Sequence, residues 1–272
     1  MRIAISNIAW DQPEDEAVAS ILNRFKIDAI DVAPGKYFPD PAGATSAQIA
    51  NVKDWWSERG IEITGMQALL FGTSGLNVFG SNESQSAMLH HLGHVCRIAA
   101  GLGATRLVFG SPKNRDRSGK TDEETRAIAV SFFRRLGDIA HSLGVTICLE
   151  PNPTHYGANF MTTAQETAQV VQAVGHSSVK MQLDTGALTI NGENAADVLD
   201  KFSELIGHVH ISEPDLVPIG DGRTDHRAVS SALSRYLPSH LITIEMVATR
   251  DEAHLSSIER AIQTVTSNYR FS

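Results

Sequence analysis

The feature that most constrains this chain is the recurrence of short, β-rich apolar runs along its whole length. The eight runs are RIAIS from Arg2, AIDVA from Ala29, IEITGM from Ile61, TRLVFG from Thr105, VTICLE from Val145, VKMQLD from Val179, HVHIS from His208 and LITIEM from Leu241. Longer segments with helical spacing separate them; between Asp122 and Leu143, for example, Phe132, Leu136 and Ile139 fall on one face. Strand therefore alternates with helix throughout, which predicts buried parallel strands joined by helical crossovers.

This alternation leaves two architectures, an open doubly wound sheet and a closed barrel. Eight units in 272 residues average 34 residues each, which favours the barrel. Several runs are preceded by a glycine that can adopt the left-handed conformation and end a helix. These glycines are Gly60, Gly103, Gly144 and Gly175. Because no Pro-rich, Ser-rich or charged linker divides the chain, we predict the α/β class, with a single (β/α)8 TIM barrel domain over residues 1–272.

Two local signals refine this barrel. Thr121 and Thr163 each precede a polar first helical turn, and Glu166 follows Thr163 at the spacing of a capping box. Two connections from strand to helix, about residues 67–82 and 111–120, are longer than the others. Long loops in compact domains often act as lids, so we expect these two to lie over the site.

Composition excludes several classes of protein. The chain is 42% hydrophobic and 20% charged, with a net charge of −8, which is typical of a soluble globular protein and argues against sequence-independent binding of nucleic acid. Two cysteines in apolar runs, Cys96 and Cys148, provide no disulfide framework. The N-terminal apolar run is too short for a signal peptide, and no run reaches the length of a membrane span. We therefore predict a cytoplasmic protein with no membrane or nucleic-acid partner.

The last four runs each end in a side chain that can bind a metal. These side chains are Glu150, Asp184, His210 and Glu245. In a barrel the active site lies at the carboxyl ends of the strands, so four consecutive strands would bring these groups to one point. A single carboxylate at a strand end is usually a solvated turn residue or a helix cap. Four in succession favour a common site.

Three carboxylates in one place repel one another unless a cation joins them. Together with one imidazole they form a set of mainly hard oxygen ligands, for which Mn²⁺ is the favoured ion and Mg²⁺, Co²⁺ or Zn²⁺ are alternatives. We expect His208 to point to the opposite face of the strand from His210, as a supporting or packing residue.

The motifs LEPNP, QLDTG, HVHISE and TIEM, set in eight βα units over essentially the whole chain, resemble the xylose-isomerase-like barrel superfamily of sugar isomerases and epimerases. Ketose 3-epimerases and hydroxypyruvate isomerases are its most similar members. The resemblance implies that Glu150, Asp184, His210 and Glu245 bind a divalent metal and that the substrate is a small carbohydrate. It also implies that a homo-oligomer can form, because oligomers are common in this superfamily.

The mechanism implied by the resemblance is proton transfer through a metal-stabilised cis-enediolate. The metal would hold a carbonyl and a neighbouring hydroxyl of the sugar and acidify the adjacent C–H bond. Glu150 and Glu245 would lie on opposite sides of the substrate, one removing a proton and the other returning one. Return to the same carbon gives epimerisation, and return to the neighbouring carbon gives aldose–ketose isomerisation; the sequence leaves both open.

Two departures from the family pattern concern sugar recognition. Ketose epimerases carry a His three residues after the metal Asp and an Arg six residues after the metal His, where this chain has Ala187 and Leu216. Arg223 is a candidate replacement for that Arg. It lies in the loop IGDGRTDH, whose Gly220, Gly222 and Asp225 resemble a family motif that can bind a phosphate or a sugar oxygen but also fits a tight turn.

Further substrate contacts are predicted around the strand ends. Aromatic rings could stack on a sugar, Asp31 could bind a hydroxyl or orient a ligand, and polar side chains follow Glu150 and His210. The predicted substrate-binding residues are Trp10, Asp31, Phe71, Asn152, His155, Tyr156, Glu213, Arg223 and His226. For the isolated aromatic residues, plain packing is an equal alternative.

Three other functions fit the same fold. The apurinic endonuclease IV family needs further histidines where this chain has Gln67, Gly110 and Ala187, and that reading is disfavoured. A lyase that dehydrates a keto-inositol or keto-sugar would use the same enolate and lose a hydroxyl. A barrel that binds a sugar or a partner without turnover fits the two substitutions but leaves the four-residue set unexplained. Our prediction is a metal-dependent sugar isomerase or epimerase.

Overall fold

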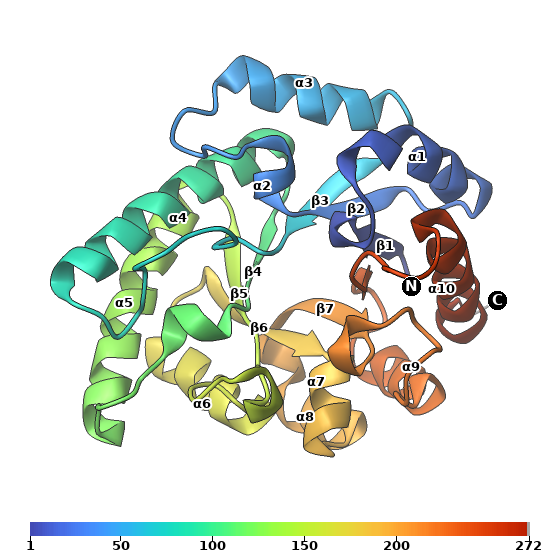
Figure 1. The fold of residues 1–272 in the computed structure, drawn as a ribbon. Coiled ribbons are helices and arrows are strands. Elements are labelled where there is room, and N and C mark those ends of the chain that lie inside the picture. Colours follow the sequence, from blue (N-terminus) through green and yellow to red (C-terminus); the bar gives the residue numbers. More distant parts are fainter. Residues whose placement is uncertain (271–272) are drawn as a thin grey trace.

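The computed structural model describes residues 1–270, and within them eight parallel strands close into a barrel (Figure 1). Every strand pairs with its neighbours in sequence, and β1 pairs with β8 to complete the ring. The strands are β1 (Ile3–Ser6), β2 (Ala29–Val32), β3 (Glu62–Met66), β4 (Arg106–Phe109), β5 (Thr146–Leu149), β6 (Val179–Asp184), β7 (Ile206–Ser212) and β8 (Ile242–Glu245). The predicted (β/α)8 barrel is confirmed.

Helices surround the barrel and cover the outer faces of the strands (Figure 1). Their bounds are α1 (Asp15–Arg24), α2 (Pro34–Tyr37), α3 (Ser46–Ser57), α4 (Asn82–Leu102), α5 (Asp122–Ser142), α6 (Ala164–Val174), α7 (Thr185–Asn191), α8 (Ala195–Phe202), α9 (His226–Tyr236) and α10 (His254–Tyr269). Neighbouring helices such as α4 and α5 also pack against each other. Within residues 1–270, no helix has the length and apolar character needed to cross a membrane.

Local sequence signals explain where these helices begin and end. Thr121 and Glu124 form a reciprocal capping box at the start of α5. Thr163 caps α6, but the Glu166 carboxylate bonds to Thr162, so only half of the box that we expected is present. The four glycines predicted before strands all have positive φ, between 59° and 88°. The chain therefore turns from helix to strand where the sequence indicates.

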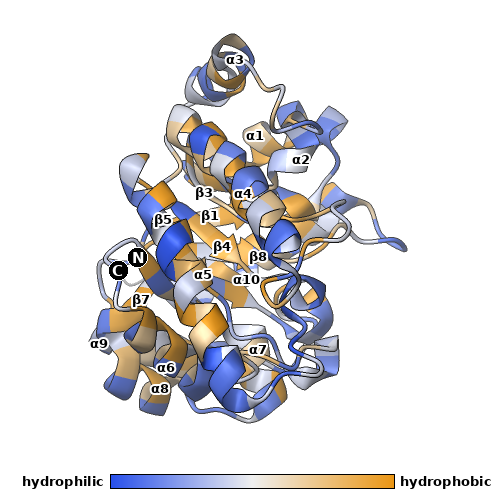
Figure 2. Cartoon of the chain, turned by 90° about the vertical axis from the view of Figure 1, so that its left-hand side faces the viewer, coloured by the Kyte–Doolittle hydropathy of each residue, from blue (hydrophilic) through white to orange (hydrophobic). Residues whose placement is uncertain are grey.

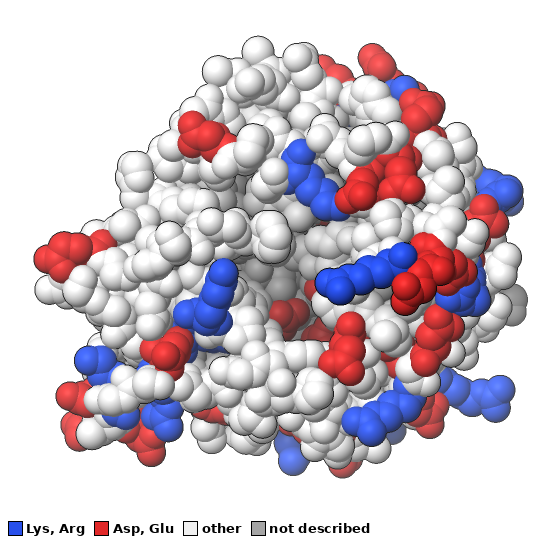
Figure 3. Space-filling view, in the orientation of Figure 1, with Lys and Arg blue, Asp and Glu red and all other residues white. Residues whose placement is uncertain are grey.

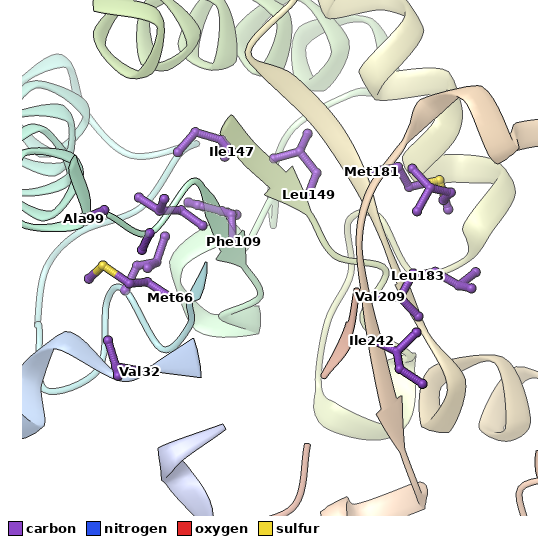
Figure 4. Packing of buried hydrophobic residues seen from close by; sticks show 14 of the residues in the cluster. Val32, Met66, Ala99, Phe109, Ile147, Leu149, Met181, Leu183, Val209 and Ile242 are labelled. Carbon is purple, nitrogen blue, oxygen red and sulfur yellow. The ribbon is translucent and has the colours of Figure 1, made fainter. Parts of the chain in front are cut away.

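The apolar core lies between the strands and the inner faces of the helices. Figure 2 shows hydrophobic strands inside and hydrophilic outer helical surfaces. Figure 4 shows members of this core, among them Met66 and Phe109 from the strands and Ala99 from α4. Phe109 packs edge-on against Phe133 of α5, with ring centroids 5.3 Å apart. Burial of each such side chain contributes about 1.5–3 kcal/mol, which holds the strand ends in place.

The two long connections lie where we expected them. Residues 67–81 join β3 to α4, and residues 110–121 join β4 to α5 and include a short 3-10 helix at Pro112–Arg115. Both loops follow the carboxyl ends of their strands, and both contribute residues to a cavity beside Glu150 and Glu245. They therefore border the region in which a site is expected.

Candidate active site

The structure brings together the four side chains predicted from the last four strand ends. Glu150 follows β5, Asp184 ends β6, His210 lies in β7 and Glu245 ends β8. One ligand atom from each residue lies within 4.8 Å of one from every other. Strand register explains this, because Asp184 lies directly beside His210 on the adjacent strand. We call these four residues the open cluster.

Neutral donors hold each carboxylate of the open cluster. Asp184 accepts hydrogen bonds from the Ala187 amide at 2.6 Å and from Ser212 Oγ at 2.8 Å. Glu245 accepts one from Gln67 Nε2 at 2.7 Å. Glu150 accepts one from Asn152 Nδ2 at 3.0 Å, as expected for a residue in the loop after β5. Each acid is thus oriented without an ion pair to Lys or Arg among these contacts.

Glu150 depends on two features that sequence reasoning did not single out. A Cβ at Gly110 would lie 2.0 Å from Glu150 Oε2, so any larger residue there would displace the carboxylate from this position. Arg115 is fully buried and donates to the backbone carbonyls of Glu150 at 2.7 Å and Gly110 at 3.3 Å. Burial lowers the pKa of Arg115 to about 10. A charged residue in a long loop is usually solvated, so no sequence signal pointed to this role.

Like charges and burial perturb the open cluster strongly. Burial, together with the nearby Glu245 and Glu150 carboxylates, raises the pKa of Asp184 well above its usual range. Burial alone would lower the pKa of His210, but the same two glutamates outweigh burial and raise it. His210 Nδ1 lies 3.2 Å from Glu245 and 3.6 Å from Glu150. The cluster therefore concentrates more negative charge than its single imidazole can balance.

This donor set fits a divalent cation. Three carboxylates and one imidazole nitrogen are close enough to share one ion, and hard oxygen ligands predominate. Binding an ion would remove the repulsion that raises the pKa of Asp184. The structural features therefore support a divalent metal site at Glu150, Asp184, His210 and Glu245, without identifying the ion.

A second carboxylate–imidazole pair lies deeper in the barrel. Asp31 Oδ2 lies 2.6 Å from His208 Nε2, and both side chains are fully buried. Asp31 also accepts hydrogen bonds from Thr64 Oγ1 at 3.0 Å and Thr243 Oγ1 at 2.9 Å. Asp31 is therefore satisfied by the protein itself and faces other barrel strands. We call Asp31 and His208 the closed pair.

The expected orientation of His208 is wrong. Its ring lies 5.2 Å from that of His210, centroid to centroid, so both residues point into the barrel. Side chains alternate between faces with a period of two, and residues two apart share a face. The sequence also predicts a supporting role for His208, and its bond to Asp31 inside the barrel agrees with that role.

The remaining predicted substrate residues fall into separate places. Trp10 is fully buried, donates to Asp15 at 2.7 Å and packs against Trp56, so it is a packing residue.

Glu213 is also buried, and it organises the loop after β7. Its carboxylate accepts from the amides of Gly220 and Thr224 and lies 2.9 Å from His226 Nε2, and His226 Nδ1 lies 2.8 Å from Tyr269. Glu213 and His226 thus bond to each other and to the loop.

The loops after β5 and β7 meet above the cluster. Tyr156 Oη accepts a hydrogen bond from the Asp215 amide at 2.8 Å, and His155 pairs with the Asp215 carboxylate at 2.8 Å. Arg223 lies in a separate depression that His155 also borders, and this depression is not lined by the open cluster. The structure therefore does not bring Arg223 to the carboxylates.

Two cavities open beside the cluster, and both are lined by Glu150 and Glu245. One, of about 360 Å³, is lined chiefly by apolar side chains, including Phe71; the other, of about 370 Å³, combines prolines and Leu216 with the polar side chains of Asn152, Tyr156 and Asp184. Figure 3 shows the hollow at the centre of this face, with acidic side chains at its bottom. We call them the apolar cavity and the polar cavity.

Comparison with known families agrees with this geometry. Residues 20–264 match the family described as the xylose isomerase-like TIM barrel. The chain belongs to this family. The resemblance inferred from the strand-end motifs is thereby confirmed at the level of the superfamily.

Curated relatives come from two kinds of enzyme. The chain is 30% identical over 120 residues to a D-psicose 3-epimerase of Enterocloster bolteae, which is 44% of this chain and 38% of the relative. It is 27% identical over 111 residues to an inosose dehydratase of Lacticaseibacillus casei, which is 41% of this chain and 36% of the relative. The matched stretches thus span less than half the length of either curated relative. The family includes ketose epimerases and dehydratases.

A solved structure extends the likeness of fold to the whole chain. D-Psicose 3-epimerase from Clostridium cellulolyticum H10, crystallised with D-tagatose, has a TM-score of 0.83 and covers 100% of both chains. Only 17% of the residues are identical, so this match demonstrates the barrel fold and leaves substrate choice to be inferred from the residues of this chain.

Proposed function

We propose that this protein is a divalent-metal-dependent isomerase or epimerase of a sugar or sugar derivative. The observation that carries the proposal is the open cluster, in which two glutamates on separate strand ends flank one imidazole and face both cavities. Paired carboxylates in that arrangement suit the removal of a proton and its return. The epimerases and dehydratases among the relatives favour chemistry of this class.

The four residues of the open cluster would hold the cation, with Mn²⁺ as the proposed ion. When bound, it supplies Lewis-acid polarisation of a substrate carbonyl. Glu150 and Glu245 are the acid–base pair: one takes the proton from the carbon beside the carbonyl, and the other delivers a proton to the resulting enediolate. Asn152 and Gln67 each hold one carboxylate oxygen, which orients these acids toward the substrate.

A dehydratase is the second candidate. Its support is the similarity to inosose dehydratases, which matches about as much of the chain as the similarity to epimerases does. The first step is the same proton removal. The outcomes differ afterwards, because loss of a neighbouring hydroxyl replaces return of the proton.

Proton exchange in D₂O tests the proposed function. The chelator-treated protein and the protein loaded with Mn²⁺ are incubated with keto-sugars and a keto-inositol, and deuterium at the carbon beside the carbonyl is followed by NMR. We expect metal-dependent exchange, with an epimer or isomer accumulating. Exchange with a dehydrated product would establish the dehydratase. Binding of Mn²⁺, followed independently by electron paramagnetic resonance, without exchange on any substrate would overturn the proposal.

A further inference from the structure

The apolar cavity carries the exposed large apolar side chains of this protein. Among residues 1–270, these are Phe71, which is 84% exposed, and Val247, which is 44% exposed, and both line this one cavity. Single apolar residues are common on protein surfaces, but a concentration of them beside a charged site indicates contact with an apolar group. The cavity is continuous with Glu150 and Glu245, so its occupant lies next to the proposed acid–base pair.

Most of the side chains that line this cavity are apolar. Leu69 and Leu70 come from the loop after β3, Val108 comes from β4 and Ile8 follows β1. Lys113 is the one basic residue in the lining. The other polar side chains besides the two glutamates are Gln67, which donates to Glu245, and Ser111, which donates to Asn114, so both already have partners.

Leu216 is held at the boundary between the two cavities by a strained turn. Asp215 and Leu216 both have positive φ, 60° and 53°, a conformation that costs free energy in residues other than glycine. The turn is fixed by the hydrogen bond from the Asp215 amide to Tyr156 Oη and by that from the Val247 amide to the Leu216 carbonyl at 3.0 Å. Leu216 lines both cavities, so the strained turn places an apolar side chain beside the site.

The two cavities therefore suit different parts of one molecule. A hydroxyl group buried without a partner costs about 1–3 kcal/mol, so a fully hydroxylated sugar chain is disfavoured in the apolar cavity. The polar cavity offers Asn152, Tyr156 and Asp215 to such hydroxyls. Each cavity, at about 360–370 Å³, is of a size typical of small-molecule sites.

From these features we propose that the substrate is a keto-sugar bearing an apolar substituent, such as an alkyl or aryl aglycone. The substituent occupies the apolar cavity, the sugar hydroxyls occupy the polar cavity, and the reacting carbon lies between them at Glu150 and Glu245. The inference rests on the proposed function and deepens it. The chemistry remains a proton removed and a proton returned, with no net oxidation or reduction.

A series of matched substrates tests this. Exchange in D₂O is measured for methyl, butyl and phenyl glycosides of one 3-keto-hexopyranose, in which the ketone stays free because the aglycone is attached at the anomeric carbon, beside the free ketose D-fructose. We expect kcat/KM for exchange to rise about tenfold or more from the methyl to the phenyl glycoside, mainly through KM, because the phenyl ring buries additional apolar surface. A kcat/KM for the methyl glycoside or for D-fructose equal to or above that for the phenyl glycoside overturns the inference and leaves the proposed function standing.

Variants locate the effect in the cavity. In Phe71→Ala, the kcat/KM for the phenyl glycoside divided by that for the methyl glycoside should fall at least threefold, because the exposed ring is lost from the cavity wall. The control Phe25→Ala removes a phenylalanine at the end of α1, outside the cavity, and should keep the parent ratio. An unchanged ratio in Phe71→Ala, with a dimer-to-monomer change in sedimentation, would assign the cavity wall to contact with a second copy and overturn the inference. Failure of exchange with every substrate rejects the proposed function itself.

Discussion

Two carboxylate–imidazole groups lie inside the same barrel, and they differ in how their charges are balanced. In the closed pair, one carboxylate meets one imidazole and two threonine hydroxyls; Asp31, His208 and Thr243 are buried and Thr64 is partly buried. In the open cluster, three carboxylates share one imidazole and border two cavities. The carboxylate of the closed pair is balanced by donors of the protein itself, whereas the open cluster retains repulsion between carboxylates that a cation would remove.

The difference shows how one architecture separates stability from function. Burial would raise the pKa of Asp31, but His208, His210 and the Thr243 hydroxyl outweigh it and hold the pKa below its usual range. Asp184 shows the opposite result, because burial and the neighbouring Glu245 and Glu150 carboxylates together raise its pKa. A perturbed carboxylate beside a cavity is typical of functional sites, where local stability is sacrificed for chemistry.

The largest expected effect follows from neutralising one acid of the open cluster. Glu150→Gln and Glu245→Gln should each lower the proton-exchange rate by about 10²–10⁴-fold, the usual contribution of an acid–base group, while some metal still binds. Neither variant should unfold more readily in urea without metal, because each removes a like charge near Asp184. Glu58→Gln, an exposed control at the end of α3, should change neither quantity. A near-parental exchange rate in either active-site variant would reject the two-glutamate mechanism.

Breaking the closed pair should affect folding instead. Asp31→Ala removes the acceptor of the buried His208 imidazole and Thr243 hydroxyl, while Thr64 Oγ1 keeps the Ile30 carbonyl, and it should lower the free energy of unfolding by about 3–5 kcal/mol in urea titrations. Asp31→Asn keeps a side-chain oxygen as an acceptor and should lose less. If the free energy of unfolding of Asp31→Ala equals that of the parent, the closed pair does not stabilise the fold.

A third pair, Glu213 and His226, extends the comparison to pH. The loop amides and His226 lower the pKa of Glu213 to about 2 from 4.5, although burial acts in the other direction. A depressed pKa in the folded state stabilises the protein above about pH 4.5, and that stabilisation, about 3 kcal/mol at most, is lost as the pH falls toward 2.

Glu213→Gln should remove this part of the acid dependence. The parent and the variant should therefore differ most in their unfolding free energies at neutral pH and converge as the pH falls below about 4.5. Urea titrations at pH 6, 4.5 and 3 measure this. A constant difference across those three values would mean that ionisation of Glu213 does not hold the loop.

Much of the candidate site followed from the positions of residues along the strands. The four residues of the open cluster were predicted to converge because each closes a strand of a closed parallel ring, and the ring brings strand ends together. The same reasoning did not predict the places of Trp10 and Arg223, which also lie near strand ends or in loops after them. Trp10 is buried against Trp56 and Asp15, and Arg223 lies in a separate depression.

Periodicity and strand-end chemistry in the sequence alone determined the barrel and the set of metal-capable residues, because both depend on local patterns that repeat along the chain. Tertiary structure decided which acids are satisfied and which are not. Asp31 and Asp184 are both aspartates at or near the ends of strands, and both accept hydrogen bonds, yet Asp31 faces an imidazole whereas Asp184 also faces two carboxylates. The buried Arg115 behind Glu150 and the two unlike cavities likewise depend on segments far apart in sequence, because long-range packing decides their neighbours.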